Sequence, residues 1–438
     1  MIAKVLLWGT VVGYLSNDGE NNIYFSYDES FVKRGVEISP IMMPLREAAY
    51  SFPNLISDTF RGLPGLFADS LPDRFGRKVI NEYLISIGKD KNSLSPIEEL
   101  LYIGCRGMGA LEYQPVLDGT LNEPNEIRVR DIADAAKEVL QRRSDSVLKP
   151  EIGKLRDLIK VGSSAGGAKA KAIVAYNEQT GVYRSGQMDA GPGFSYWIIK
   201  FDKVDQESLN SFYDSYQTRE EYAYYLMAKA AGIKMNESRL LKEEGNYHFM
   251  TKRFDRYTDS NGKMQKIHMQ TACGLGHIDY AVKHNISYSA IFNIMDDLGV
   301  DFEDKYELFR RMIFNLVTSN YDDHAKNFSF LMDRRGKWSL SPAYDLTYSN
   351  DPNSNYINNH QCLINGKSDS ITAEDCFAVG LEAGLTKPKM QRIVEEVCEA
   401  VKQWIHFAEQ SDIPESKARE DFVKSHYLHM TDDRRSLV

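Results

Sequence analysis

The apolar pattern of this chain changes character along its length, and the order of those changes constrains the fold most. Before Ile286 the apolar residues mostly form short β-type runs, whereas after it they recur mainly at helical spacing. A chain of 438 residues is too long for one core, so we expect two or three packing units. The order predicts an α+β protein with a β-rich N-terminal unit, a small β lobe and a larger helical lobe.

The N-terminal unit is expected to span residues 1–125. Its first β-type runs are Val5–Trp8, Val11–Leu15 and Ile23–Tyr27. A glycine between the first two runs predicts a hairpin. Ser57–Glu82 has helical spacing that two prolines divide, and Tyr102–Tyr113 predicts a glycine-rich strand segment. A polar stretch at 118–126 predicts the linker that ends this unit.

The small lobe is expected at 126–256 and the helical lobe at 257–438. In the small lobe we expect helices at Arg128–Arg143 and Arg219–Ala231 and strands at Leu158–Val161, Ala172–Tyr176, Tyr196–Phe201, Ser238–Leu241 and His248–Phe254. In the helical lobe we expect helices at Lys305–Thr318 and Lys389–Ala408 and a strand pair at Phe328–Met332 and Trp338–Ser341.

Composition excludes several classes of protein. The five cysteines are scattered and include no CxxC pair, which argues against a disulfide framework or a zinc site and fits a reducing cytoplasm. The net charge of -9 opposes strong sequence-independent binding to nucleic acid. No apolar run approaches the roughly 20 residues that span a bilayer, so we expect no membrane partner.

The strongest chemical signal is the run from Asp322 to Asn327, with Asp345 following after a strand pair. Phosphoryl transfer needs a carboxylate beside the attacking hydroxyl and oxygen ligands for magnesium, and kinases space the catalytic Asp and metal-binding Asn this way. Asp322 is therefore the candidate base, and Asn327 and Asp345 the candidate metal ligands. Asp323 could replace Asp322, although the spacing favours Asp322. A polar loop that only caps turns is the bland alternative.

Two further features fit a nucleotide site. The glycine-rich run 162–171 could bring backbone N–H groups close to phosphates, although it is not a Walker A loop and alone would suggest a hairpin turn. Lys200 ends an apolar strand, as the kinase lysine that holds the α and β phosphates does, and Glu221 on the next helix is its expected partner. Glu220 would lie about 100° around that helix. A lone lysine at a strand end is otherwise a solvated residue.

The strand that ends in Lys252, Arg253 and Phe254 would form the hinge between the lobes, whose backbone can bind an adenine edge. A plain strand with a salt-bridged Arg-Phe-Asp-Arg end explains the same residues equally well. The small and helical lobes together match the two-lobed layout of a protein kinase.

Taken together, these motifs resemble the HipA family of toxin kinases. Tyr321–Ser329 resembles the family's DGHAKNFS segment with Asp323 in place of Gly, and Leu340–Asp345 resembles its LTPxYD segment. Arg253–Arg256 matches its RFDR, Lys200 its strand lysine, and Leu71-Pro72-Asp73 an LPD element of its N-terminal subdomain. The resemblance extends from early in the chain past Asp345.

The resemblance implies an ATP- and Mg²⁺-dependent serine/threonine protein kinase with Asp322 as base and Asn327 and Asp345 as magnesium ligands. It places the nucleotide against Gly166, Gly167, Ala168, Lys169, Ala170, Lys171, Lys200, Glu221, Lys252, Arg253, Phe254, His324, Lys326 and Tyr344. It also implies autophosphorylation in the glycine-rich loop, at Ser164 or Ser163, which would eject the loop and stop activity.

The resemblance further implies a helix-turn-helix antitoxin, operator DNA bound through it, and a protein substrate in the translation machinery such as an aminoacyl-tRNA synthetase. Two alternatives remain open from the sequence. One is a lipid or small-molecule kinase of the same fold, and the other is a non-catalytic module that binds ATP or the antitoxin.

Overall fold

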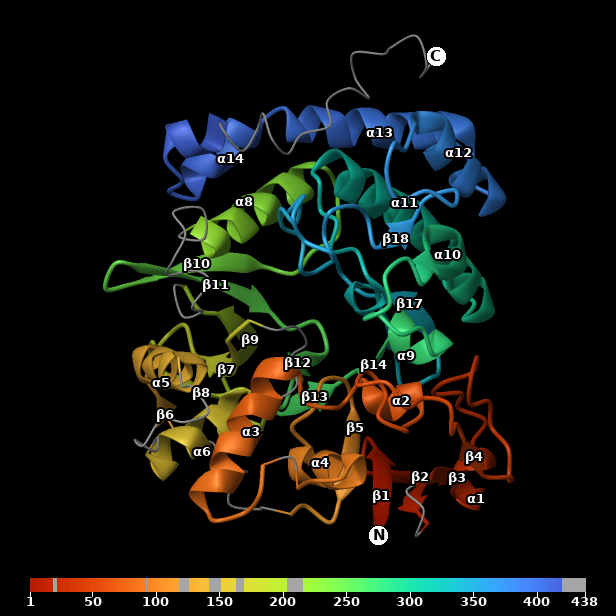
Figure 1. The fold of residues 1–438 in the computed structure, drawn as a ribbon, viewed down its shortest axis with the longest axis vertical. Coiled ribbons are helices and arrows are strands. Elements are labelled where there is room, and N and C mark those ends of the chain that lie inside the picture. Colours follow the sequence, from red (N-terminus) through yellow and green to blue (C-terminus); the bar gives the residue numbers. More distant parts are fainter. Residues whose placement is uncertain are drawn as a thin grey trace.

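The computed structural model describes residues 1–18, 22–91, 93–117, 126–141, 151–162, 169–202 and 216–419. Figure 1 shows three groups of elements, with the N-terminal elements at the bottom, a second sheet at the left and the C-terminal helices across the top. The mixed helix and antiparallel-sheet composition confirms the predicted α+β class.

The first sheet has five strands in the order β4-β3-β2-β1-β5, and each neighbouring pair is antiparallel. Its strands are β1 (Ile2–Leu7), β2 (Thr10–Asn17), β3 (Ile23–Tyr27), β4 (Tyr50–Ser51) and β5 (Leu111–Gln114). The predicted hairpin is confirmed, and Gly9 has a φ of +79° in its turn, a conformation that glycine adopts without steric cost.

Four helices lie between β3 and β5 in the chain. They are α1 (Glu29–Val32), α2 (Gly65–Ala68), α3 (Arg74–Ser86) and α4 (Pro96–Ile103). Asp73 caps α3 by accepting a hydrogen bond from the Gly76 N–H at 2.6 Å. The predicted strand at Tyr102–Tyr113 is wrong over most of its length, because a capping box of Ser95 and Glu98 starts α4 and only β5 is extended.

The second sheet has six strands in the order β10-β11-β9-β7-β8-β6. They are β6 (Glu126–Ile127), β7 (Lys171–Tyr176), β8 (Tyr183–Ser185), β9 (Ser195–Lys200), β10 (Ser238–Glu243) and β11 (Asn246–Lys252). Its helices are α5 (Val129–Gln141), α6 (Ile152–Val161) and α8 (Gln217–Ala230). The predicted strand at Leu158–Val161 is wrong, because Leu155, Leu158 and Ile159 bury one face of α6 at helical spacing.

The helical lobe contains α9 (Ala272–Gly276), α10 (Tyr288–Asp297), α11 (Phe302–Val317), α12 (Ala373–Glu382), α13 (Lys387–Val401) and α14 (Trp404–Gln410). The predicted helix Lys389–Ala408 is two helices, since the chain turns at Lys402. Short strands are β12 (Arg256–Thr258), β13 (Met264–Lys266), β14 (His268–Thr271), β15 (Ile286–Ser287), β16 (Ser329–Met332), β17 (Trp338–Leu340) and β18 (Cys362–Leu363). The predicted strand pair is confirmed as β16 and β17.

Two hydrophobic cores connect these groups across the chain order. The larger core joins the first sheet to the helical lobe, and the smaller one joins α3 to α5, α6 and the second sheet. The N-terminal unit therefore packs against both lobes. Among the described residues, no helix combines the length and apolarity needed to cross a membrane.

Candidate active site

Lys200, the last residue of β9, lies between two carboxylates. Its Nζ donates a hydrogen bond to Glu221 Oε1 at 2.5 Å and another to Asp345 Oδ1. Only 13% of the Lys200 side chain is exposed, so the three groups interact with little screening. Glu220 turns away and pairs with Lys417 at 3.6 Å. The structure thus brings together the lysine and the helix glutamate that the sequence paired.

Burial and neighbouring charges together set the protonation states of this cluster. Burial raises the pKa of Glu221, with the charge of Lys200 opposing the shift. Burial would also raise the pKa of Asp345, but the charges of Lys200 and Lys171 hold it well below its usual range. Asp345 is therefore an anion at neutral pH.

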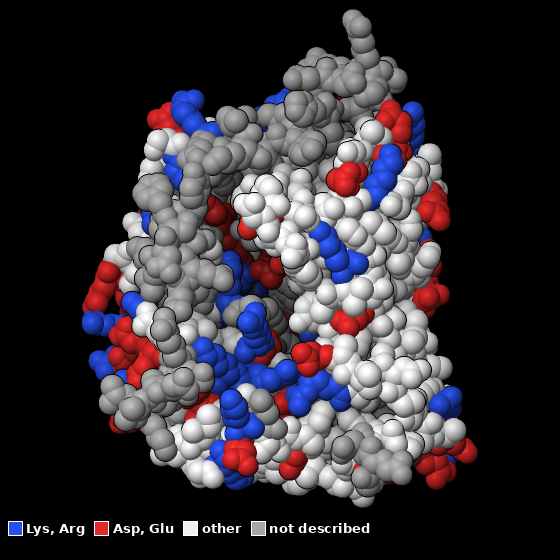
Figure 2. Space-filling view, in the orientation of Figure 1, with Lys and Arg blue, Asp and Glu red and all other residues white. Residues whose placement is uncertain are grey.

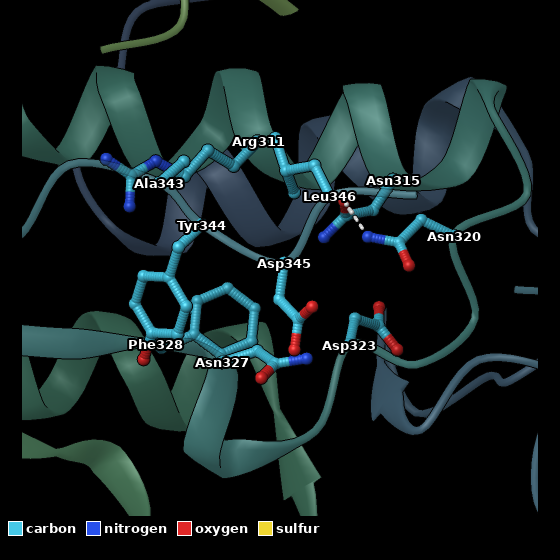
Figure 3. A pocket seen from close by; sticks show the side chains of 10 residues that line it. All are labelled: Arg311, Asn315, Asn320, Asp323, Asn327, Phe328, Ala343, Tyr344, Asp345 and Leu346. Atoms are coloured by element: carbon cyan, nitrogen blue, oxygen red, sulfur yellow. Dashed lines mark hydrogen bonds between the residues drawn. The ribbon is translucent and has the colours of Figure 1, made fainter. Parts of the chain in front are cut away.

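Asp345 has a φ of +56°, in the left-handed region that non-glycine residues seldom adopt. Tyr344 fixes the preceding position, because its hydroxyl donates to the Lys326 carbonyl at 2.6 Å and contacts Ser329 Oγ at 2.5 Å. Figure 3 shows the Asp345 carboxylate turned toward the Asn327 amide. The unusual backbone conformation thus aims an anion at the predicted metal site.

The loop Asp322–Asn327 contains a short 3-10 helix, η3 (Ala325–Asn327). Asn327 Nδ2 donates to the Asp322 carbonyl at 2.7 Å, and His324 Nε2 lies 3.7 Å from Asp322 Oδ1. Asp322 keeps 37% of its side chain exposed, while burial raises the pKa of its carboxyl and His324 opposes the shift. This carboxylate can therefore receive a proton from a group entering the site.

Asp323, the competitor for the base, points into the protein. Its carboxylate accepts hydrogen bonds from the Gln361 and Cys362 N–H groups at 2.8 and 3.0 Å. It also contacts His360 Nδ1 at 2.9 Å and accepts from the Tyr288 hydroxyl at 3.2 Å. Asp323 is only 1% exposed, so it anchors the loop rather than facing a substrate.

Part of the predicted phosphate loop lies outside the described residues, namely Ser163, Ser164, Gly166, Gly167 and Ala168. The segment follows helix α6, whereas the sequence suggested a strand before it. Of its described end residues, Lys169 is exposed and Ala170 is buried in the smaller core. The side chain of Ala170 therefore faces the protein interior.

Lys171 belongs to β7 and stands directly opposite Lys200 on β9. Burial lowers the pKa of the Lys171 ammonium, and the largest opposing influence is the charge of Asp73 at the start of α3. Sequence reasoning placed Lys171 in a loop and gave Asp73 no role. The LPD element contained Asp73, but only the fold shows that α3 reaches this sheet.

The hinge residues are mostly engaged within the small lobe. The N–H of Lys252 donates to the Glu237 carbonyl, and that of Arg253 to the Tyr196 carbonyl, both at 2.8 Å. The Lys252 ammonium turns toward Glu237 at 3.8 Å. Among the described residues, no backbone carbonyl accepts a hydrogen bond from the Phe254 N–H.

The side chain of Arg253 does not face the site. It donates twice to Asp255, at 2.8 and 2.7 Å, and Arg256 donates to the same carboxylate at 2.8 Å. The Gly109 N–H donates to Asp255 at 2.7 Å, and Arg256 donates back to the Gly109 carbonyl at 2.6 Å. The salt-bridged strand end that the sequence also allowed is thus present, and it clamps the N-terminal unit to the hinge.

Lys326 and two tyrosines complete the site. The Lys326 Nζ lies 4.7 Å from the ring centroid of Tyr280, whose ring is 5.1 Å from that of His324. Tyr356 donates from its hydroxyl to the Tyr280 carbonyl at 2.7 Å. No sequence motif marked either tyrosine, because both come from loops without regular spacing.

The residues present suit a nucleotide with a hard cation. Figure 2 shows a hollow near the middle of this face, where acidic and basic side chains meet, with more basic side chains below it. Within the described residues, no cluster of three His, Cys, Asp or Glu side chains could hold a metal ion. Asp345 and Asn327 supply oxygen donors, and Mg²⁺ commonly takes one or two protein ligands together with substrate phosphates. The donor set therefore fits magnesium.

Comparison with known proteins gives the family. The model of the HipA N-terminal domain matches residues 3–114, and that of the HipA-like C-terminal domain matches residues 163–405, more than half of the chain. The serine/threonine-protein kinase toxin HipA of Shewanella oneidensis is 25% identical over 423 residues, which cover 90% of this chain and 87% of that protein. Y4mE of Sinorhizobium fredii is 31% identical over 135 residues, 30% of this chain and 32% of that protein.

A solved structure supports the fold independently. A chain of the Shewanella oneidensis MR-1 complex of HipA, HipB and operator DNA aligns with a TM-score of 0.69 and 17% identity, and the alignment covers 99% of both chains. This likeness confirms the fold, and the family-model matches extend over both halves of the sequence. The chain belongs to the HipA family.

Proposed function

We propose that this protein is an ATP- and Mg²⁺-dependent serine/threonine protein kinase and the toxin of a toxin–antitoxin pair. The observation that carries the proposal is Lys200 held between Glu221 and Asp345, with Asn327 and Asp322 on the adjoining loop. Phosphoryl transfer depends mainly on positioning and on stabilising charge, and this arrangement supplies both.

The nucleotide would lie between the two lobes. The Phe254 N–H would meet the adenine edge, and the ammonium groups of Lys200 and Lys171 would face the phosphates. Asp345 and Asn327 would hold Mg²⁺, which when bound neutralises charge on the phosphate oxygens. The side chains of Lys326 and His324 would line the γ-phosphate end of the site.

The chemical step assigned to the protein is proton removal. Asp322 would accept the proton of an incoming serine or threonine hydroxyl as its oxygen bonds to the γ-phosphorus and the bond to the β-phosphate oxygen breaks. Burial raises the pKa of Asp322 and so makes its carboxylate a better proton acceptor. Lys326 would stabilise negative charge on the transferred group.

The partners in this proposal come from relatives. The aligned structure contains HipB and operator DNA, so we expect an antitoxin that binds this protein and, through it, DNA. The acceptor is expected to be a protein of the translation machinery, such as an aminoacyl-tRNA synthetase. Autophosphorylation at Ser164, or at Ser163, would stop the activity. Both serines lie outside the described residues.

The decisive experiment is phosphate transfer in a cell lysate. Wild-type protein with Mg-ATP should label a protein on serine or threonine, and Asp322→Asn should lower the rate by about 10²-fold or more. Asp369→Asn changes an exposed carboxylate elsewhere and is the matched control. Label appearing only on lipid or an aminoglycoside would support the alternative kinases, and no label with intact ATP binding would support the non-catalytic module.

A further inference from the structure

Two tyrosine rings stand beside the proposed base. The Tyr280 ring is 5.1 Å from the His324 ring, and the Tyr356 ring is 6.5 Å from it. His324 in turn lies 3.7 Å from Asp322. Burial raises the pKa of the Tyr356 hydroxyl, and the charge of Asp322 is the next largest influence in the same direction. Neither ring has a part in the nucleotide contacts proposed above.

The two tyrosines come from loops that fasten to each other. Tyr280 lies in the loop 277–285 and Tyr356 in the loop 350–361. The Tyr356 hydroxyl donates to the Tyr280 carbonyl at 2.7 Å, and His284 contacts Asn359 at 3.2 Å. Where the loops end, β15 and β18 pair in parallel. The two rings therefore lie on one continuous wall, which the loops 277–285 and 350–361 form together.

Residues of the N-terminal unit contact the loop 277–285 and support this wall. The Gly65 N–H donates to His277 Nε2 at 3.0 Å, and the Phe52 ring packs edge-on against His277 at 4.5 Å. Thr59 donates from its hydroxyl to the Asp279 carboxylate. Glycine is required at Gly65, because a Cβ there would lie 2.2 Å from the Gly274 carbonyl oxygen. Such close packing holds the loop 277–285 in place next to Asp322.

Exposed apolar side chains occur on two of these connected segments. Val282 is 54% exposed and follows Tyr280 by two positions, and Ile56 is 82% exposed on the N-terminal segment that contacts Asp279 through Thr59. Single exposed apolar residues are ordinary on protein surfaces. Here the two lie on segments that the Thr59–Asp279 hydrogen bond joins.

We infer that Tyr280 and Tyr356 are positioning residues for the acceptor. The acceptor that they orient is a serine or threonine of a polypeptide, with an apolar side chain close to it in sequence. The inference rests on the proposed kinase function and names the chemistry of its acceptor. Tyrosine rings offer rigid apolar faces and a hydroxyl, so they can pack against an acceptor backbone and its apolar neighbour. A small polar metabolite would gain little from such a wall.

The test uses full-length protein, Mg-ATP and a positional peptide library with one central serine. The best wild-type peptides should carry an apolar residue near the serine. With the best peptide, Tyr280→Leu and Tyr356→Leu should each raise the peptide KM by about 3- to 10-fold, the range expected for loss of an aromatic contact. The KM for ATP should change less than twofold, and Tyr280→Phe should restore most of the peptide affinity.

Tyr14→Leu is the matched control, since Tyr14 is exposed on the outer face of the first sheet. If Tyr280→Leu does not fold, Val282→Asp gives a second measurement, because Val282 is exposed and its substitution leaves the core intact. Val282→Asp should raise the KM of peptides that carry an apolar residue near the serine. Equal peptide KM values for wild type and the leucine variants would overturn the inference and leave the kinase proposal standing. Absence of transfer to any peptide or protein by the wild type would overturn both.

Discussion

Lys171 and Lys200 are direct cross-strand partners on β7 and β9, so two ammonium groups lie side by side in the candidate site. Like charges placed opposite each other destabilise a sheet. Here Glu221 and Asp345 offset the charge of Lys200, and Asp73 offsets that of Lys171. In the proposed function, the phosphate groups of a bound nucleotide would offset this unfavourable pair further.

The Lys200–Glu221 contact predicts non-additive kinetics. Lys200→Ala should lower kcat/KM by about 10²-fold or more, because it removes the charge that faces the phosphates. If the glutamate acts only by holding the lysine, the Lys200→Ala/Glu221→Ala double variant should be no slower than Lys200→Ala. A double-mutant cycle measures this coupling, and strictly additive losses would show that the two residues act separately.

Asp345 and Asn327 should govern the affinity for the magnesium–nucleotide complex. Asp345→Ala or Asn327→Ala should weaken binding of a non-hydrolysable Mg-ATP analogue by at least about tenfold, because each removes an oxygen donor. Titration calorimetry measures the affinity, and circular dichroism checks the fold. Unchanged affinity in both variants would contradict the metal assignment.

Asp255 should be essential to the stability of the hinge. Its side chain is 0% exposed and neutralises two buried arginines, so Asp255→Asn leaves uncompensated charge and should cost about 3–5 kcal/mol in the free energy of unfolding. Urea denaturation measures the loss. Glu178→Gln, which breaks the exposed pair with Arg239, is the control and should change the free energy of unfolding far less.

His268 should make stability depend on pH. Burial lowers the pKa of His268 from 6.5 to about 4, while its Nε2 contacts the Ile38 carbonyl at 3.0 Å. The unfolded chain therefore binds a proton between these two values that the native protein does not. This contribution is complete above pH 6.5 and is lost as the pH falls toward 4, by up to about 3 kcal/mol.

The measurement is the pH dependence of unfolding for wild type and His268→Gln between pH 7 and about 4.5, a range set by that shift. The variant should show a shallower loss of stability, since other groups that titrate are common to both proteins. Parallel curves would mean that His268 gains a proton in the native state as readily as in the unfolded one.

Ser164 should be the site of a self-inactivating modification. A phosphate adds a charge of about -1.5 to -2, which would be repelled by the triphosphate of ATP. Ser164→Asp should therefore lose ATP affinity and Ser164→Ala should keep it, with Ser163 as the weaker site. Mass spectrometry of wild-type protein after incubation with Mg-ATP checks the position. Unmodified serines in a protein that phosphorylates another protein would end the self-inactivation idea.

Local sequence rules predicted the parts of this fold whose signals are local. The first hairpin and the pair β16–β17 depend on turn residues and on the spacing within one element. The partnership of Lys200 with Glu221 was predicted from the order of a lysine strand and a glutamate helix in a kinase small lobe. Helix α6 was missed because a window of four residues cannot distinguish the periods of a helix and a strand.

Residues distant in the chain account for what the sequence could not give. Asp73 influences Lys171 across about a hundred positions, and Thr59 reaches Asp279 across more than two hundred, so no spacing rule applies. The spacing to Asn327 favoured Asp322 over Asp323, and the contacts of residues 360–362 with Asp323 show that the Asp323 carboxylate is buried.

The packing of the N-terminal unit on both lobes limits how the two lobes can move relative to each other. Helix α3 contributes to the small-lobe core, whereas α2 contributes to the core of the helical lobe, and only five residues separate them in the chain. Rotation of one lobe about the hinge would pull one of these helices out of its core. The angle between the lobes is therefore expected to stay nearly constant.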